Sequence, residues 1–87
     1  MTFTKDPNAV LDYSLDWTRW LDGDAIATSE WIVPDDLVRV TDSRTTKIAT
    51  IWLSGGLAGQ SYTITNRITT TGGRTEDRSF AVKVEER

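Results

Sequence analysis

Polar and apolar residues alternate most regularly in the last third of the chain. Even-numbered positions from Tyr62 to Thr70 are mainly apolar, whereas their odd-numbered neighbours carry hydroxyl or charged groups. After the pair Gly72-Gly73, the same alternation returns at Phe80, Val82 and Val84. A period of two is typical of strands that place one face on a core. The two segments therefore predict a β-hairpin.

The spacing of this hairpin predicts its loop. The inward residues of both strands are even-numbered, so facing pairs such as Asn66–Phe80 or Ile64–Val82 require an odd number of loop residues. A two-residue turn at Gly72-Gly73 would pair even with odd positions and direct one apolar face outward. We therefore expect a three-residue loop, or a bulge beside the two glycines.

Strand patterns also occur upstream, although less regularly. In residues 25–33 both faces carry apolar side chains, and a bulge between Thr28 and Trp31 would reconcile them. In residues 45–53, Ile48 and Trp52 share one face while the other is also apolar, which is typical of a central strand or of one with a covered outer face. The further strands that we expect are 9–17, 37–41 and a short edge strand over 2–5.

One short segment departs from the strand pattern. Trp17, Trp20 and Leu21 have the i, i+3, i+4 spacing of a single helical turn, which we expect to lie across an open end of the sandwich. With six or seven short strands and no long helix, the chain is predicted to be a single all-β sandwich domain over residues 1–87.

The hairpin is preceded by a glycine three residues before Tyr62. This Gly59-to-Tyr62 segment resembles the tyrosine corner of immunoglobulin-like and fibronectin-like sandwiches, although Gly56 occupies the place of the usual leucine. The expected fold is therefore an immunoglobulin-like (fibronectin type III-like) sandwich of six to seven antiparallel strands.

Composition narrows the possible functions. The 87 residues include no cysteine and no histidine, so disulfides, thiolate zinc sites and histidine bases are excluded. The net charge is −3 with acids and bases interspersed, which argues against nucleic acid as a partner. No segment resembles a signal peptide or a membrane span. We therefore expect a complete short protein that is made and kept in a reducing cytoplasm.

A narrower resemblance rests on several short sequence motifs that occur in a fixed order. They are residues 16–21 (DWTRWL), 23–26 (GDAI), Trp31, 52–56 (WLSGG), Tyr62 and 73–75 (GRT). In the order and spacing of these motifs the chain resembles a family of small proteins of tailed bacteriophages and prophages, described as fibre–tail adaptor or Ig-like virion proteins. The resemblance implies a structural protein of the virion, near the tail or neck, synthesised in the host bacterial cytoplasm. It also implies that its partners are other virion proteins, with several copies in each particle.

The aspartates raise the possibility of metal binding or of catalysis. Asp22 and Asp24, with other nearby aspartates, supply the oxygen ligands that calcium takes, but their spacing does not match an EF-hand loop. A turn with solvated carboxylates is the favoured interpretation, and no cofactor is expected. An 87-residue sandwich leaves little room for a catalytic cleft, so we do not expect an enzyme.

Protein contacts are the expected chemistry instead. The favoured interpretation of the tryptophans is that Trp20 packs over Trp52 and closes the sandwich; the alternative is an apolar docking patch. Arginines near the final loop are either solvated or available to an acidic partner. The candidate interface residues are Trp20, Ile48, Trp52, Arg67, Arg74 and Arg78. The alternative function is an Ig-like decoration module that binds a host surface or glycan.

Overall fold

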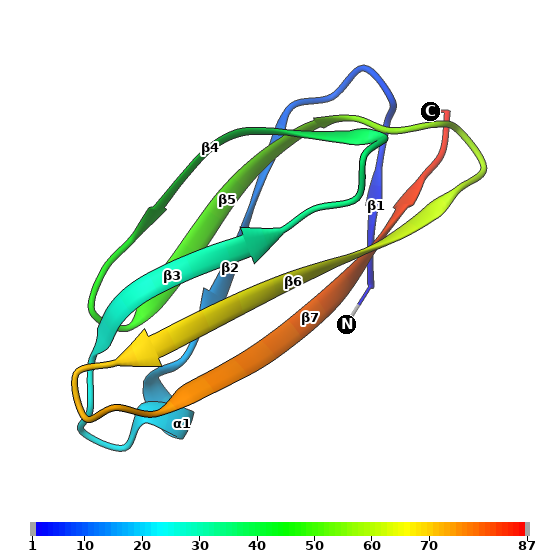
Figure 1. The fold of residues 1–87 in the computed structure, drawn as a ribbon. Coiled ribbons are helices and arrows are strands. Elements are labelled where there is room, and N and C mark those ends of the chain that lie inside the picture. The colour runs from blue at the N-terminus through cyan, green and yellow to red at the C-terminus, as the bar shows by residue number, and fades with distance from the viewer. Residues whose placement is uncertain (1, 87) are drawn as a thin grey trace.

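The structure, a computed structural model, describes residues 2–86 and contains two β-sheets that face each other (Figure 1). The sheets hold four and three strands, in the orders β1-β7-β6-β3 and β2-β5-β4. The elements are β1 (Thr2–Lys5), β2 (Leu11–Asp16), α1 (Thr18–Leu21), β3 (Ile26–Ile32), β4 (Leu37–Arg44), β5 (Ile48–Gly55), β6 (Ser61–Thr70) and β7 (Thr75–Val84). The all-β sandwich predicted from the alternation is confirmed.

The strand order is that of an immunoglobulin-like sandwich. If β1 to β7 are lettered A to G, the sheets contain the C-F-G and B-E-D neighbours of a constant-type domain. The first strand differs, because β1 lies beside β7 and runs parallel to it. The expectation of antiparallel strands throughout is therefore wrong for β1.

The parallel position of β1 is held by an unusual lysine. Lys5 is 0% exposed, and its Nζ donates to the carbonyl oxygens of Asp6 at 2.9 Å and Gly55 at 2.7 Å. Burial lowers the pKa of this ammonium group because desolvation disfavours the charged form. The two carbonyl oxygens offset part of that cost, so Lys5 ties the first strand to the end of β5.

The core lies between the sheets and is formed by the inward half of each alternating strand. A row of aromatic rings crosses it, with Phe80 of β7 at 5.4 Å from Tyr13 and 6.1 Å from Trp31 between ring centroids. The fully buried apolar residues are Trp17, Ala49, Ile51, Leu53, Ile64, Ile68, Val82 and Val84. As the pattern of residues 45–53 predicts, β5 is central in its sheet.

The β6–β7 hairpin has the predicted three-residue loop. Thr70 N–H donates to the Arg74 carbonyl at 2.8 Å, which leaves residues 71–73 in the turn, with Gly73 at a φ of 89°. Even-numbered residues of β6 face even-numbered residues of β7, as predicted. The predicted partners in β7, however, are two residues too late in the chain. Ile64 faces Phe80, because the loop closes at Thr70 and Arg74 rather than one residue later.

The tyrosine corner has the expected bond. The Tyr62 hydroxyl accepts a hydrogen bond from Leu57 N–H at 3.0 Å, five residues upstream. The departure at Gly56 has a steric reason, since a Cβ there would lie 2.7 Å from the side chain of Val84. At this point of the corner the backbone approaches β7 too closely for a leucine.

Both β3 and β4 contain a β-bulge. In β3 the register shifts between Ile26 and Thr28, so the bulge predicted between Thr28 and Trp31 is misplaced. The early bulge lets Ile26 and Trp31 both face the core. β4 extends to Arg44, three residues beyond its expected end, and its register also shifts between Arg39 and Thr41.

Candidate functional site

The end of the sandwich that holds α1 and the β6–β7 loop is closed by paired aromatic and polar groups. Trp17 is fully buried, and its Nε1 donates to the Asn66 side-chain oxygen at 3.0 Å. The Asn66 amide in turn donates to Ser29 Oγ at 2.9 Å and to the Glu30 carbonyl at 3.0 Å. The Trp17–Asn66 pair therefore joins α1 to both β6 and β3 through satisfied hydrogen bonds.

Two of the predicted interface arginines belong to this closed end. The guanidinium of Arg78 lies over the Trp17 ring, 4.2 Å from its centroid, and donates to the Asp16 carbonyl at 3.1 Å. The guanidinium of Arg74 lies over the Trp20 ring at 4.3 Å and donates to the Leu21 carbonyl at 2.7 Å. Both arginines stabilise the fold through cation–π contacts and hydrogen bonds within the chain.

Trp20 does not close the sandwich by packing over Trp52. Its ring contacts Trp17 edge-on, with the centroids 5.4 Å apart. Trp52 instead points outward from β5, between the buried Ile51 and Leu53. The favoured interpretation of the tryptophans is therefore wrong, because the helical turn places Trp20 at the end of the sandwich and not over a sheet face.

Asp24 connects the closed end to the hairpin loop. Its carboxylate accepts hydrogen bonds from Thr71 Oγ1 at 2.9 Å and from Gly72 N–H at 3.1 Å, and it contacts Arg74 Nε at 3.3 Å. Hydrogen bonding by the Thr70 hydroxyl, together with the Ala25 N–H, holds the pKa of Asp24 well below its usual range. Its oxygens are occupied by protein donors, and across residues 2–86 no three acidic side chains gather where a metal ion could bind.

Arg67 lies apart from the other two arginines. It faces outward from β6, where its guanidinium makes two hydrogen bonds to Asp77, at 2.8 and 3.0 Å, and lies 4.0 Å from Glu30. The Arg67 guanidinium in turn lowers the pKa of the Asp77 carboxyl. The three arginines therefore form no common patch, because Arg67 points outward from β6 whereas Arg74 and Arg78 lie over tryptophan rings at the closed end.

Ile48 and Trp52 do come together, on the outer face of the three-stranded sheet. Both project from β5, with exposed fractions of 37% and 40%, and Thr50 lies between them. Val38 of β4 is 55% exposed and opposes Ser54 on the same face. We call the side chains of Val38, Ile48 and Trp52 the outer apolar face. Its β2 margin is acidic, because Asp12 pairs with Trp52 and Asp16 with Ile48.

The parity of residues 45–53 indicates which side chains share a face, but not which face is the outer one. It placed Ile48 and Trp52 on one side and Ala49, Ile51 and Leu53 on the other, as the structure has them. Val38 escaped notice because the short predicted strand over 37–41 had apolar residues on both of its sides.

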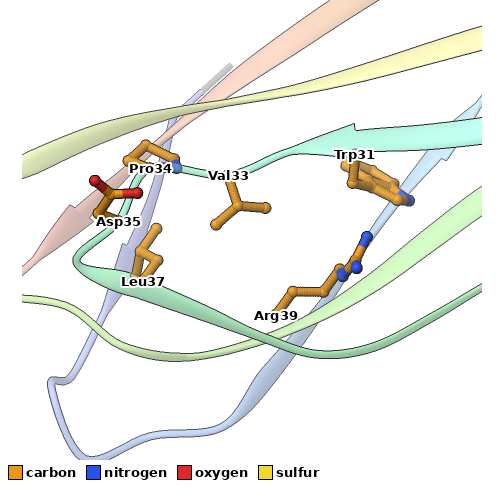
Figure 2. A pocket seen from close by; sticks show the side chains of 6 residues that line it. All are labelled: Trp31, Val33, Pro34, Asp35, Leu37 and Arg39. Carbon is orange, nitrogen blue, oxygen red and sulfur yellow. The ribbon is translucent and has the colours of Figure 1, made fainter.

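A second surface feature is a slot of about 350 Å³ between β3 and β4 (Figure 2). Its lining residues are Trp31, Val33, Pro34, Asp35, Leu37 and Arg39. Both neighbouring strands are edge strands of their sheets, and the Pro34-led turn joins them directly. Sequence reasoning missed the slot, because its walls belong to different sheets whose mutual position no local pattern reveals.

These surfaces suit binding rather than catalysis. The residues capable of acid–base chemistry on the outer apolar face are marginal carboxylates, and the slot carries one arginine and one exposed aspartate. No helix within residues 2–86 combines the length and the apolar character needed to cross a membrane.

Comparison with known proteins agrees with this description. No curated protein matches the chain. A protein family described as podophage GP4 fiber-tail adaptor protein gp77 matches residues 5–83, which covers every described strand at least in part. This family is structural, which argues against an enzymatic role, and it places the protein in the virion. With its immunoglobulin-like sandwich and the match over nearly its whole length, the chain belongs to the podophage fibre–tail adaptor family.

Proposed function

We propose that this protein links the tail or neck of a podophage virion to its fibres through protein–protein contacts. The observation that carries the proposal is the family match over residues 5–83. The rigid sandwich supports it, because both sheets share one core and present stable outer surfaces. Several copies in each particle, repeated by the symmetry of the tail, would present the same surfaces to each fibre.

The outer apolar face is the proposed docking surface on another virion protein. Trp52 is a large aromatic side chain that is 40% exposed, and tryptophan is enriched among residues that dominate binding energy. Ile48 and Val38 extend the apolar area on either side, while Asp12 and Asp16 form an acidic margin. A partner with an apolar centre and basic margin would complement this surface.

The other candidate interface residues have a smaller place in this proposal. Arg67, Arg74 and Arg78 all contact groups of their own chain, and Trp20 packs on Trp17. We therefore assign docking to Trp52 and Ile48, and internal roles to the arginines and Trp20. The acidic net charge of −3 favours protein over nucleic acid as the partner.

The test is incorporation into particles. Phages that encode Trp52→Ser or Leu57→Ser in place of the natural residue would be purified, and the copies of the adaptor in each particle counted by quantitative mass spectrometry. Leu57 is the matched control, because it is a 58% exposed apolar residue in the loop after β5, outside the outer apolar face. We expect Trp52→Ser to lower the copy number about tenfold or more, and Leu57→Ser to leave it unchanged.

Two results would contradict the proposal at different levels. Absence of the protein from wild-type particles would overturn the adaptor role, whereas normal incorporation of Trp52→Ser would overturn only the choice of docking face. Binding of the isolated domain to host cells, without affinity for tail or fibre proteins, would favour the decoration module instead.

A further inference from the structure

The β3–β4 slot contains a buried donor that lacks an acceptor. Trp31 is only 6% exposed, and its ring packs edge-on against Phe80 in the core. Its indole Nε1 is buried and makes no hydrogen bond with any of residues 2–86. A buried N–H without a partner is costly, so a group that supplies an acceptor there gains more than it would at a solvated donor.

The neighbouring cation cannot satisfy this donor. Figure 2 shows the Arg39 side chain extending from β4 toward the nitrogen-bearing edge of Trp31. An indole N–H and a guanidinium are both donors and neither can accept, so the pair lacks an oxygen. Arg39 has one ion pair, with Asp42 at 3.4 Å, and its side chain is 52% exposed. The guanidinium is therefore free to turn toward an incoming anion without leaving a buried charge behind.

The rest of the slot fits a short aliphatic stem. Val33 and Pro34 are half-buried and provide a small apolar wall, with Leu37 beneath them at 5% exposure, and the volume of about 350 Å³ is small for a ligand site, which suits one or two side chains. Asp35 lies at the opposite end from Trp31 in Figure 2, so a negative group is repelled there and attracted at the Arg39 end. The charge distribution along the slot thus fixes the orientation of an acidic occupant.

Only part of the β3 edge along the slot is accessible to a binding partner. Arg44 donates to the carbonyls of Ile26 at 3.2 Å and Ala27 at 2.5 Å, and so covers the start of the β3 edge. The accessible part runs from Trp31 to the turn at Pro34. An extended segment can lie along this part, because β3 and β4 are both edge strands.

We propose that the β3–β4 slot binds an Asp or Glu side chain on an extended segment of another protein. Its carboxylate pairs with the Arg39 guanidinium and, as the side chains over the buried indole edge turn aside, accepts a hydrogen bond from Trp31 Nε1. An aliphatic residue beside the acid would pack on Val33 and Pro34. The inference rests on the atoms of the slot and not on the outer apolar face, which projects from the opposite side of the three-stranded sheet. It therefore stands or fails separately from the proposed docking through Trp52.

The test is a titration of the purified protein with acetyl-Leu-Glu-Leu-amide, followed through the indole N–H signals in ¹⁵N NMR spectra. The Trp31 signal is assigned by its loss in Trp31→Phe. We expect it to move downfield and saturate at a dissociation constant on the order of 1 mM, while the other indole signals stay in place. Acetyl-Leu-Gln-Leu-amide keeps the shape without the charge and should bind about tenfold more weakly.

Variants decide whether the slot is responsible. Arg39→Gln should weaken binding of the glutamate peptide about tenfold, and Trp31→Phe should weaken it to a similar extent when followed through backbone amides of β3 and β4. Arg19→Gln, which changes an exposed arginine on α1, should bind as the wild type does. Preserved dispersion of the amide spectrum will show that each variant is folded.

Three outcomes would overturn the proposal. They are a Trp31 signal that does not move in saturable fashion, equal affinity for the glutamate and glutamine peptides, and unchanged affinity in Arg39→Gln. A Trp52→Ser variant that fails to enter particles but still binds the peptide would support the slot and the docking face independently.

Discussion

Trp17 at the closed end and Trp31 in the β3–β4 slot are both buried indoles with an arginine beside them, but their polar surroundings differ. Trp17 Nε1 has an acceptor in Asn66, whose own amide is also bonded. Trp31 Nε1 has none. The comparison teaches that an arginine next to a tryptophan does not by itself reveal a binding site. Whether each donor already has its acceptor is the more informative property.

The largest loss of stability is expected at Trp17, where the hydrogen-bond network with Asn66 is complete. Trp17→Phe removes the indole N–H, leaves the buried oxygen of Asn66 unpaired and opens space beside the core. Together these should lower the free energy of unfolding by about 3 kcal/mol. Urea unfolding followed by circular dichroism measures it. A loss below about 1 kcal/mol would show that the closed end tolerates an unpaired acceptor, and the comparison with Trp31 would fail.

A smaller effect is expected for the arginine clamp on Trp20. Arg74→Ala removes the cation–π contact and the bond to the Leu21 carbonyl, but the side chain is 44% exposed, so solvent screening reduces the loss. We expect about 1 kcal/mol of lost stability, measured in the same unfolding assay. Arg19→Ala on α1 is the control and should cost less than about 0.5 kcal/mol. Equal losses in the two variants would contradict an internal role for Arg74.

The closed end should also depend on acid through Asp24. Its pKa in the folded protein is lowered, so its contribution to stability is complete above the unfolded pKa of about 3.9 and is lost as the pH falls toward the folded value. Below about pH 4, wild-type stability should therefore fall more steeply than that of Asp24→Asn. Urea midpoints between roughly pH 2.5 and 5 will show the difference.

Asp22→Asn is the matched control for this pH dependence. Asp22 has a positive φ of 49°, which asparagine also adopts, so the substitution keeps the backbone of the turn. It should retain the steep wild-type decline. A decline that is equally steep in Asp24→Asn would assign the acid sensitivity to other carboxyl groups.

The smallest effect is expected at the slot. Trp31→Phe keeps the aromatic packing on Phe80 and removes a donor that has no acceptor, so the lost packing area and the relieved N–H nearly cancel. The change in unfolding free energy should stay within about 1 kcal/mol, well below that of the same substitution at Trp17. A loss as large as that of Trp17→Phe would mean that the Trp31 N–H is satisfied in solution.

The features predicted from sequence were those that local periodicity controls. Alternation located the strands. Parity gave the three-residue hairpin loop as one of two alternatives and grouped Ile48 with Trp52 on one face of their strand, but it did not tell which face points outward. The register of the hairpin was missed by two residues, because the turn is held by Thr70 and by contacts from the distant Asp24. The parallel pairing of β1 was missed for the same reason, since no local pattern tells an edge strand which neighbour to choose.

The same distinction between local pattern and long-range contact applies to the candidate site. Residue type draws attention to the arginines near the last loop, but the main partners of Arg74 and Arg78 are carbonyls and rings of residues 16–21, far away in the chain, and Arg67 pairs with Asp77. The slot needed the relative placement of two sheets. Its one sequence signal was the short turn at Pro34, which joins two edge strands without an additional strand between them.

The pairing of β1 with β7 has a consequence for how the protein reaches its folded state. β1 is synthesised before the other described strands, yet its neighbour in the sheet is β7, and the Lys5 bond to Gly55 also requires residues made much later. Such distant pairings slow folding, because a long loop must close before any contact repays its entropy. The four-stranded sheet is therefore incomplete until β7 has emerged from the ribosome.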